Sequence, residues 1–103
     1  MAQVIDDGKT LTLTLSPLEK LGAFHGDITI NKSQLISIEE STTPWTLSVL
    51  RGIRAPGTGI PFVIMLGTLR HRQGKDFAAV YKKRPVRIYN LKDAPYKRWI
   101  VTI

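Results

Sequence analysis

The sequence predicts a single mainly β domain over residues 1–103, an antiparallel barrel or sandwich with one short helix near residues 17–21 and no C-terminal helix. Three observations predict it. Apolar and polar residues alternate over short runs, turn residues separate those runs at short intervals, and only one segment carries helix signals. A chain of 103 residues has room for one modest core.

The clearest strand lies near the beginning of the chain. Leu11, Leu13 and Leu15 fall on one face of the run "KTLTLTLS", and threonines occupy the other face. This period of two is typical of a half-buried strand. Asp7-Gly8 separates the run from a preceding apolar stretch, which indicates a β-hairpin.

The segment "SPLEKLG" predicts the short helix. Its signals are an N-cap, a proline at the first helical position, a capping-box glutamate and a terminal glycine: Ser16, Pro17, Glu19 and Gly22. Only Leu18 and Leu21 supply an apolar face, so we expect one or two turns that pack with these leucines over one end of the barrel.

The remaining strands follow one another, separated by turn residues. They are expected over residues 27–30, 35–40, 45–50, 62–71, 76–81, 86–91 and 96–103. Residues 62–71 are apolar on both faces, as expected of a strand near the centre of a sheet. Trp99, Val101 and Ile103 would share one face, so we expect the end of the chain to be tied into the sheet.

Charge is distributed unevenly along the chain. Residues 1–50 contain three basic and six acidic side chains, which gives −3, whereas residues 51–103 contain twelve basic and two acidic side chains, which gives +10. A fold that keeps the halves apart would have a basic face for anions. Its expected members are Arg70, Arg72, Lys75, Lys82, Lys83 and Arg84. The alternative is that these side chains only solvate the outer faces of strands.

Residues 51–61, "RGIRAPGTGIP", combine three glycines, two prolines and two arginines. One interpretation is a tight connection that leads into a buried strand. The other is an anion site, in which backbone N–H groups and guanidinium groups converge. Its candidate residues are Arg51, Arg54, Gly57, Thr58 and Gly59. The segment matches neither a Walker loop nor a dinucleotide fingerprint.

Four segments, "SPLEKLGAFHGDI", "RGIRAPGTGIP", "GKDFAAVY" and "APYKRWIVTI", resemble a group of small uncharacterised bacterial proteins linked to pleckstrin-homology-like barrels. The resemblance implies a small antiparallel β-barrel and no particular activity. Two features depart from the pleckstrin-homology pattern. The chain ends in a strand instead of a helix, and the first hairpin turn reads "DDGK", where many lipid-binding members have basic residues.

The sequence contains few residues suited to catalysis. The chain has no cysteine, and its two histidines, His25 and His71, lie in separate turns or strand ends. These residues favour no zinc site and no cofactor. Ser16 is better explained as a helix cap than as a nucleophile, and nothing favours Glu39 and Asp76 as a catalytic carboxylate pair.

Single-stranded nucleic-acid binding is the main alternative to a protein partner. Basic segments flank the strand over residues 76–81, and aromatic residues accompany them: Tyr81, Tyr89, Tyr96 and Trp99. In single-strand binding, bases stack on aromatic rings and basic side chains contact the phosphates. The same aromatic residues would otherwise pack in the core.

The sequence therefore favours a noncatalytic binding module with a basic face for a protein or another anionic partner. The absence of cysteine, of a signal peptide and of a membrane-spanning apolar run predicts a cytoplasmic protein without integral membrane association. Exposed strand edges would also allow two copies to pair.

Overall fold

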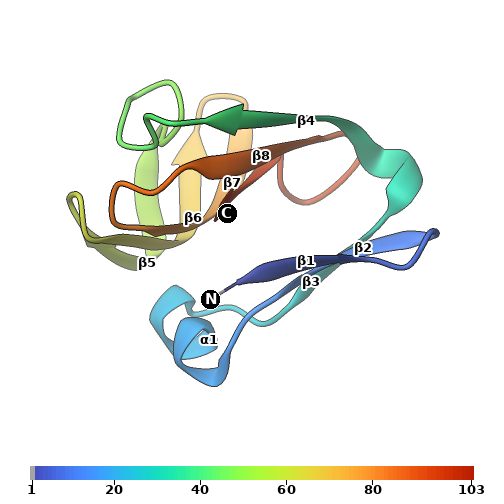
Figure 1. Cartoon of the computed structure of the whole chain (residues 1–103), viewed down its shortest axis with the longest axis horizontal. Helices are drawn as coiled ribbons and strands as arrows, with labels where there is room; N and C mark the ends of the chain where they lie inside the picture. Colours follow the sequence, from blue (N-terminus) through green and yellow to red (C-terminus); the bar gives the residue numbers. More distant parts are fainter. Residues whose placement is uncertain (1) are drawn as a thin grey trace.

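The computed structural model describes residues 2–103 and shows a mainly β protein with one short α-helix (Figure 1). In chain order the elements are β1 (Gln3–Asp6), β2 (Thr10–Thr14), α1 (Pro17–Ala23), β3 (Ile28–Asn31), the 3-10 turn η1 (Lys32–Gln34), β4 (Leu35–Ser41), β5 (Ile53–Ile60), β6 (Ile64–His71), β7 (Gly74–Tyr81), β8 (Val86–Leu91) and β9 (Arg98–Thr102). The described part of the chain contains no apolar helix of membrane-spanning length.

The strands form two sheets that lie one above the other in Figure 1. Three strands pair in the order β1-β2-β3, and six pair in the order β4-β8-β9-β7-β6-β5. The turn η1 leads from the smaller sheet to the larger one. Among residues 2–103, no strand pairing joins the two sheets, so the predicted closed barrel is not confirmed.

The prediction of purely antiparallel pairing is wrong at one place. Strand β9 lies between β8 and β7; it is antiparallel to β8 and parallel to β7, with Phe77 opposite Trp99. The chain passes from β7 to β8 and leaves a gap between them, which β9 then fills. Residue alternation is the same in parallel and antiparallel strands, so the sequence pattern does not distinguish the two.

Both faces of the six-stranded sheet are covered. On the face toward the smaller sheet, Phe77 and Trp99 pack with Leu11, Leu13 and other buried residues. Phe77, Trp99 and Leu13 have no exposed surface. The predicted shared face of Trp99 and Val101 is confirmed, because both belong to this cluster.

The opposite face of the six-stranded sheet carries a second apolar cluster. Ala78, Val80 and Ile100 alternate with the residues of the first cluster along β7 and β9. Val49 and Trp45, from the segment between β4 and β5, pack over them. This two-sided burial explains why β7 and β9 read as nearly continuous apolar runs.

The segments before β6 differ from the prediction. Residues 45–50 form turns instead of a strand, with Val49 and Leu50 N–H groups both donating to the Thr46 carbonyl. The expected connection over residues 51–61 is instead mostly strand β5. Gly57 and Gly67 face each other across a bulge with φ of 148° and 134°, and a Cβ at Gly57 would lie 2.3 Å from the Leu66 carbonyl oxygen. The glycines therefore serve a close strand approach.

Helix α1 confirms the predicted capping and corrects its orientation. The Ser16 hydroxyl accepts from Glu19 N–H, and the Glu19 carboxylate accepts from Ser16 N–H. Leu18 and Leu21, the expected inward face, are 80% and 70% exposed, whereas Glu19 and Ala23 are buried. The helix also continues past Gly22 to Ala23.

Candidate functional site

The five residues of the predicted anion site do not form a loop. Gly57, Thr58 and Gly59 lie in β5 and pair with β6. The Thr58 hydroxyl donates to the Gly22 carbonyl at 2.7 Å, which ties β5 to α1. The Arg54 guanidinium donates to the Gly59 carbonyl at 3.2 Å. Arg51 lies before β5 and has a different partner, so the structure does not bring the two arginines together on one anion.

Arg51 belongs to an ionic cluster centred on Asp76, the third residue of β7. Asp76 is fully buried. Its carboxylate accepts from Arg51 Nε at 2.8 Å and from Arg98 Nε at 2.9 Å. His71 Nε2 lies 2.9 Å from the same carboxylate, and Gln73 N–H donates to His71 Nδ1. The ring proton of His71 therefore lies on Nε2, which donates to Asp76.

The Asp76 cluster holds the segment between β4 and β5 against the sheet. Arg98 also donates to the carbonyls of Ser48 and Val49, at 3.2 and 2.7 Å. Burial alone would raise the pKa of the Asp76 carboxyl, but hydrogen bonds from Arg51, His71 and Arg98 outweigh it and hold that pKa below its usual value. One sequence signal could have revealed the cluster: Asp76 begins an otherwise apolar strand, and a buried carboxylate needs cationic partners.

The six residues of the predicted basic face lie at two ends of the larger sheet. Arg70, Arg72 and Lys75 lie around the β6–β7 turn, whereas Lys82, Lys83 and Arg84 form the turn after β7. The eight residues of β7 separate the two groups by about 25 Å. Lys75 Nζ lies 4.8 Å from the centre of the Tyr96 ring. A single continuous basic face is therefore not formed by these residues.

The aromatic residues expected to form a nucleic-acid platform mostly lie in the core. Tyr89, Tyr96 and Trp99 are 8%, 3% and 0% exposed. Tyr81 is half-buried and its hydroxyl donates to the Glu19 carboxylate. Burial, together with this hydrogen bond, raises the pKa of the Tyr81 phenol. These four rings do not offer bases a row of open faces.

The histidines are also separated. His25 Nδ1 lies 2.7 Å from the Gly26 carbonyl oxygen, and its ring contacts Phe77 and Tyr96 edge-on. His71 is engaged by Asp76 in the cluster described above. Glu39 lies on β4, separated from Asp76 by strands β8 and β9, and accepts from Asn90. The structure therefore does not place Glu39 and Asp76 as a catalytic pair.

The structure reveals a surface around Trp45 that the sequence interpretation missed. Two depressions share Trp45 in their linings. One, of about 200 Å³, is lined by Thr42, Thr43, Pro44, Trp45, Thr46, Phe62 and Lys83. The other, of about 240 Å³, is lined by Trp45, Thr46, Leu47, Leu50, Pro61 and Met65. We call these two depressions, with the adjoining Lys82, the Trp45 surface.

Contacts from three segments fix the Trp45 surface. Trp45 Nε1 donates to the Lys82 carbonyl at 2.6 Å, and Lys82 N–H donates to the Val63 carbonyl at 2.8 Å. The Trp45 and Phe62 rings lie 5.8 Å apart, and Lys83 Nζ lies 5.1 Å from the centre of the Phe62 ring. The β5–β6 and β7–β8 turns thus meet at one side of the molecule (Figure 1).

The Trp45 surface is apolar, basic and exposed. Leu47, Phe62 and Val63 are 89%, 56% and 50% exposed. Within residues 2–103, no carboxylate forms an ion pair with Lys82 or Lys83. The sequence pattern predicts Phe62 and Val63 in a buried strand, but Pro61 is a signal of the turn that exposes them.

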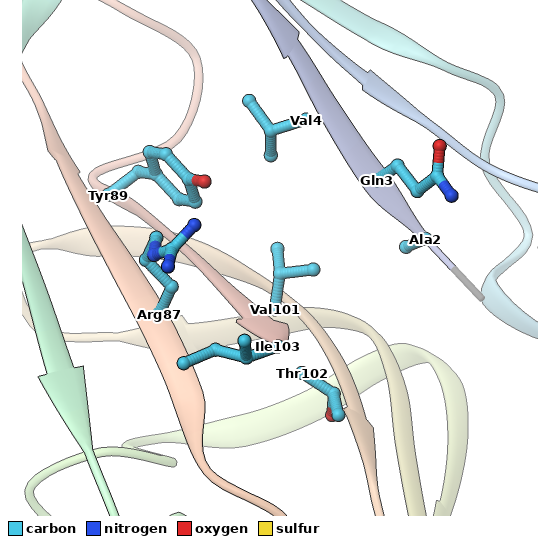
Figure 2. A pocket seen from close by; sticks show the side chains of 8 residues that line it. All are labelled: Ala2, Gln3, Val4, Arg87, Tyr89, Val101, Thr102 and Ile103. Carbon is cyan, nitrogen blue, oxygen red and sulfur yellow. The ribbon is translucent and has the colours of Figure 1, made fainter.

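A cleft of about 360 Å³ lies between the edge strand β1 of the smaller sheet and the interior strands β8 and β9 of the larger sheet (Figure 2). Val4 of β1 faces Tyr89 of β8 and Val101 of β9 across it. Arg87 is the only charged side chain among the described residues that line it, and its guanidinium donates to Glu40 at 3.0 Å. This hydrogen bond from Arg87 to Glu40 raises the pKa of Arg87. The cleft therefore offers a ligand an apolar wall and a cation that already has a partner.

Comparisons of the chain with protein-family models, with curated proteins and with solved structures found no match. The relationship to pleckstrin-homology-like bacterial proteins accordingly stays a prediction, and the Trp45 surface must be interpreted from its own chemistry.

Proposed function

We propose that this protein is a noncatalytic binding module that attaches to an anionic partner through the Trp45 surface. The observation that carries the proposal is the position of Lys83, which lines an exposed apolar depression, with Lys82 beside it in the same turn; neither side chain has a carboxylate partner among the described residues. Contiguous exposed apolar surface marks interaction sites, and cations beside it select for negative charge.

The cations at the other end of the larger sheet support this choice by contrast. Arg51 and Arg98 are engaged by Asp76, so they contribute to folding. Among the described residues, the charged groups of Lys82 and Lys83 form no ion pair that serves the fold; Lys83 Nζ lies over the Phe62 ring, and the fold contacts of Lys82 are made by its backbone. The cleft between the sheets is less suited to an anion, because Arg87 is paired with Glu40.

Binding to a panel of anionic partners tests the proposal. The panel comprises an acidic polypeptide that contains leucine, a thymidine oligonucleotide and vesicles that contain phosphatidylserine. The test variant is Lys82→Glu with Lys83→Glu. Its matched control is Lys9→Glu with Lys92→Glu, which changes net charge equally at two exposed lysines outside the Trp45 surface.

We expect the unmodified protein to bind at least one member of the panel. The affinity should fall as salt is raised, and the test variant should lose about 30-fold or more, from about 1 kcal/mol for each lysine at an anionic surface. The control should change the affinity by less than about threefold. If both variants lost affinity equally, net charge alone would explain the binding, and the proposal would be overturned.

We also retain a pleckstrin-homology-like ancestry as a proposal for the fold. Its support is the resemblance of the four quoted segments and the mainly β architecture. A solved structure with the same strand order, including a parallel β7–β9 pair, in a protein of that group would establish it.

A further inference from the structure

We propose, resting on the function proposed above, that the partner is an extended acidic protein segment whose two apolar side chains occupy the two adjoining depressions that Trp45 lines. The depressions share Trp45 and Thr46 in their linings, so they adjoin each other. Side chains two positions apart on an extended chain point to the same side, about 6.6 Å apart. An apolar residue, any residue and a second apolar residue would therefore present both apolar side chains to two adjoining depressions.

The Trp45 ring, which belongs to the lining of both depressions, is held in place. The hydrogen bond from Trp45 Nε1 to the Lys82 carbonyl and the contact with Phe62 fix the orientation of the indole. A fixed aromatic side chain reduces the conformational entropy that binding would otherwise cost. Tryptophan is also enriched among the residues that dominate binding at protein interfaces.

The borders of the depressions favour a peptide over other anionic partners. Thr42, Thr43 and Thr46 line the first depression; the Thr43 and Thr46 hydroxyls bond within residues 41–48, and the Thr42 hydroxyl is suited to a hydrogen bond with a peptide backbone. The hydrocarbon interior of a bilayer has no group that could form a hydrogen bond with a hydroxyl. A nucleic acid has no aliphatic side chain for the depression formed by Leu47, Pro61 and Met65.

Charge determines which end of the segment carries the acidic residues. Lys83 lines the first depression and Lys82 adjoins it, whereas no charged residue lines the second depression. We therefore expect acidic residues to flank the apolar side chain that enters the first depression. This arrangement pairs exposed cations with carboxylates at the rim and keeps apolar groups at the centre, as at other protein interfaces.

A synthetic peptide with two leucines two positions apart, flanked by glutamates and labelled with fluorescein, tests the inference by anisotropy with the full chain. Replacing both leucines with serine should weaken binding about tenfold or more. Moving the leucines to adjacent positions should weaken it as well, because their side chains then point to opposite sides. Replacing the glutamates with lysines should abolish binding.

Protein variants locate the binding. Phe62→Ser should weaken peptide binding about tenfold, whereas Ile53→Ser, its matched control at a 75% exposed apolar residue near the far end of β5, should leave it unchanged. In an NMR titration the indole N–H signal of Trp45 should shift, and that of the buried Trp99 should remain as an internal reference. Circular dichroism confirms that each variant is folded.

The outcomes separate this inference from the proposed function. Equal binding of the leucine and serine peptides would overturn the inference, as would binding of vesicles or the oligonucleotide with no binding of the peptide. Either result would leave a binding module for anions in place. If no anionic partner binds, or if binding survives Lys82→Glu with Lys83→Glu, the proposed function falls together with the inference.

Discussion

The two ends of the larger sheet use basic residues in opposite ways. At the Asp76 cluster, arginines surround a buried carboxylate and hold a segment of chain against the sheet. At the Trp45 surface, lysines border exposed apolar side chains without a carboxylate partner among residues 2–103. The comparison shows that net charge along a sequence counts cations but does not reveal which of them are committed to the fold.

Removing the carboxylate should have the largest effect. Asp76→Asn keeps the size of the side chain but leaves Arg51 and the largely buried Arg98 without their anion. Breaking a buried ion pair from one side costs about 3–5 kcal/mol, so we expect a loss of that size in the free energy of unfolding. Urea denaturation followed by circular dichroism measures it.

Asp93→Asn is the matched control for this change. Asp93 is exposed and has a φ of 54°, a conformation that asparagine also adopts readily. We expect its unfolding free energy to remain within about 0.5 kcal/mol of the unmodified protein. If Asp76→Asn were equally mild, the cluster would not be what holds this end of the protein together.

Lowering the pH should destabilise the Asp76 cluster, by less than removing its carboxylate does. The folded pKa of Asp76 is held below its ordinary value of 3.8, so the stability from its ionisation is fully present above about pH 4. This stability is lost as the pH falls through the folded pKa. Unfolding free energies measured from neutral pH down to acid should therefore decline in the unmodified protein.

The same titration in Asp76→Asn should show a shallower decline over this range. A residual slope is expected, because hydrogen bonds from the Ser16 N–H and Tyr81 hydroxyl outweigh the burial of Glu19 and lower its folded pKa too. Parallel acid limbs in the two proteins would contradict the role given to Asp76.

Local sequence patterns predicted most strands and little of what connects them. The hairpin at Asp7-Gly8 and the cap at Ser16 depend on neighbours within a few residues, and both are present. The orientation of Leu18 and Leu21 depends on Glu19, which is turned inward and bonded to Tyr81 far along the chain. No local pattern contains that contact.

The candidate functional residues show the same difference between what local sequence predicts and what distant contacts determine. The sequence shows twelve cations in residues 51–103, but the separation of the six expected basic-face residues into two groups depends on the path of β7 between its turns. The position of Trp45 beside Phe62 arises because the segment before β5 folds back over the sheet. Apolar and polar residues alternate over residues 45–50, and this pattern predicts a strand. It therefore gives no indication of the turns that form the Trp45 surface.

The smallest effect on folding should come from the Trp45 surface itself. We expect Lys82→Ala with Lys83→Ala to change the unfolding free energy by no more than about 0.5 kcal/mol, because both side chains are exposed and form no ion pair among the described residues. The affinity for the acidic leucine peptide should nevertheless fall. Denaturation and anisotropy on the same preparation measure both quantities. A change that destabilised the protein as much as Asp76→Asn would mean that these lysines, like the arginines at the opposite end, are committed to the fold.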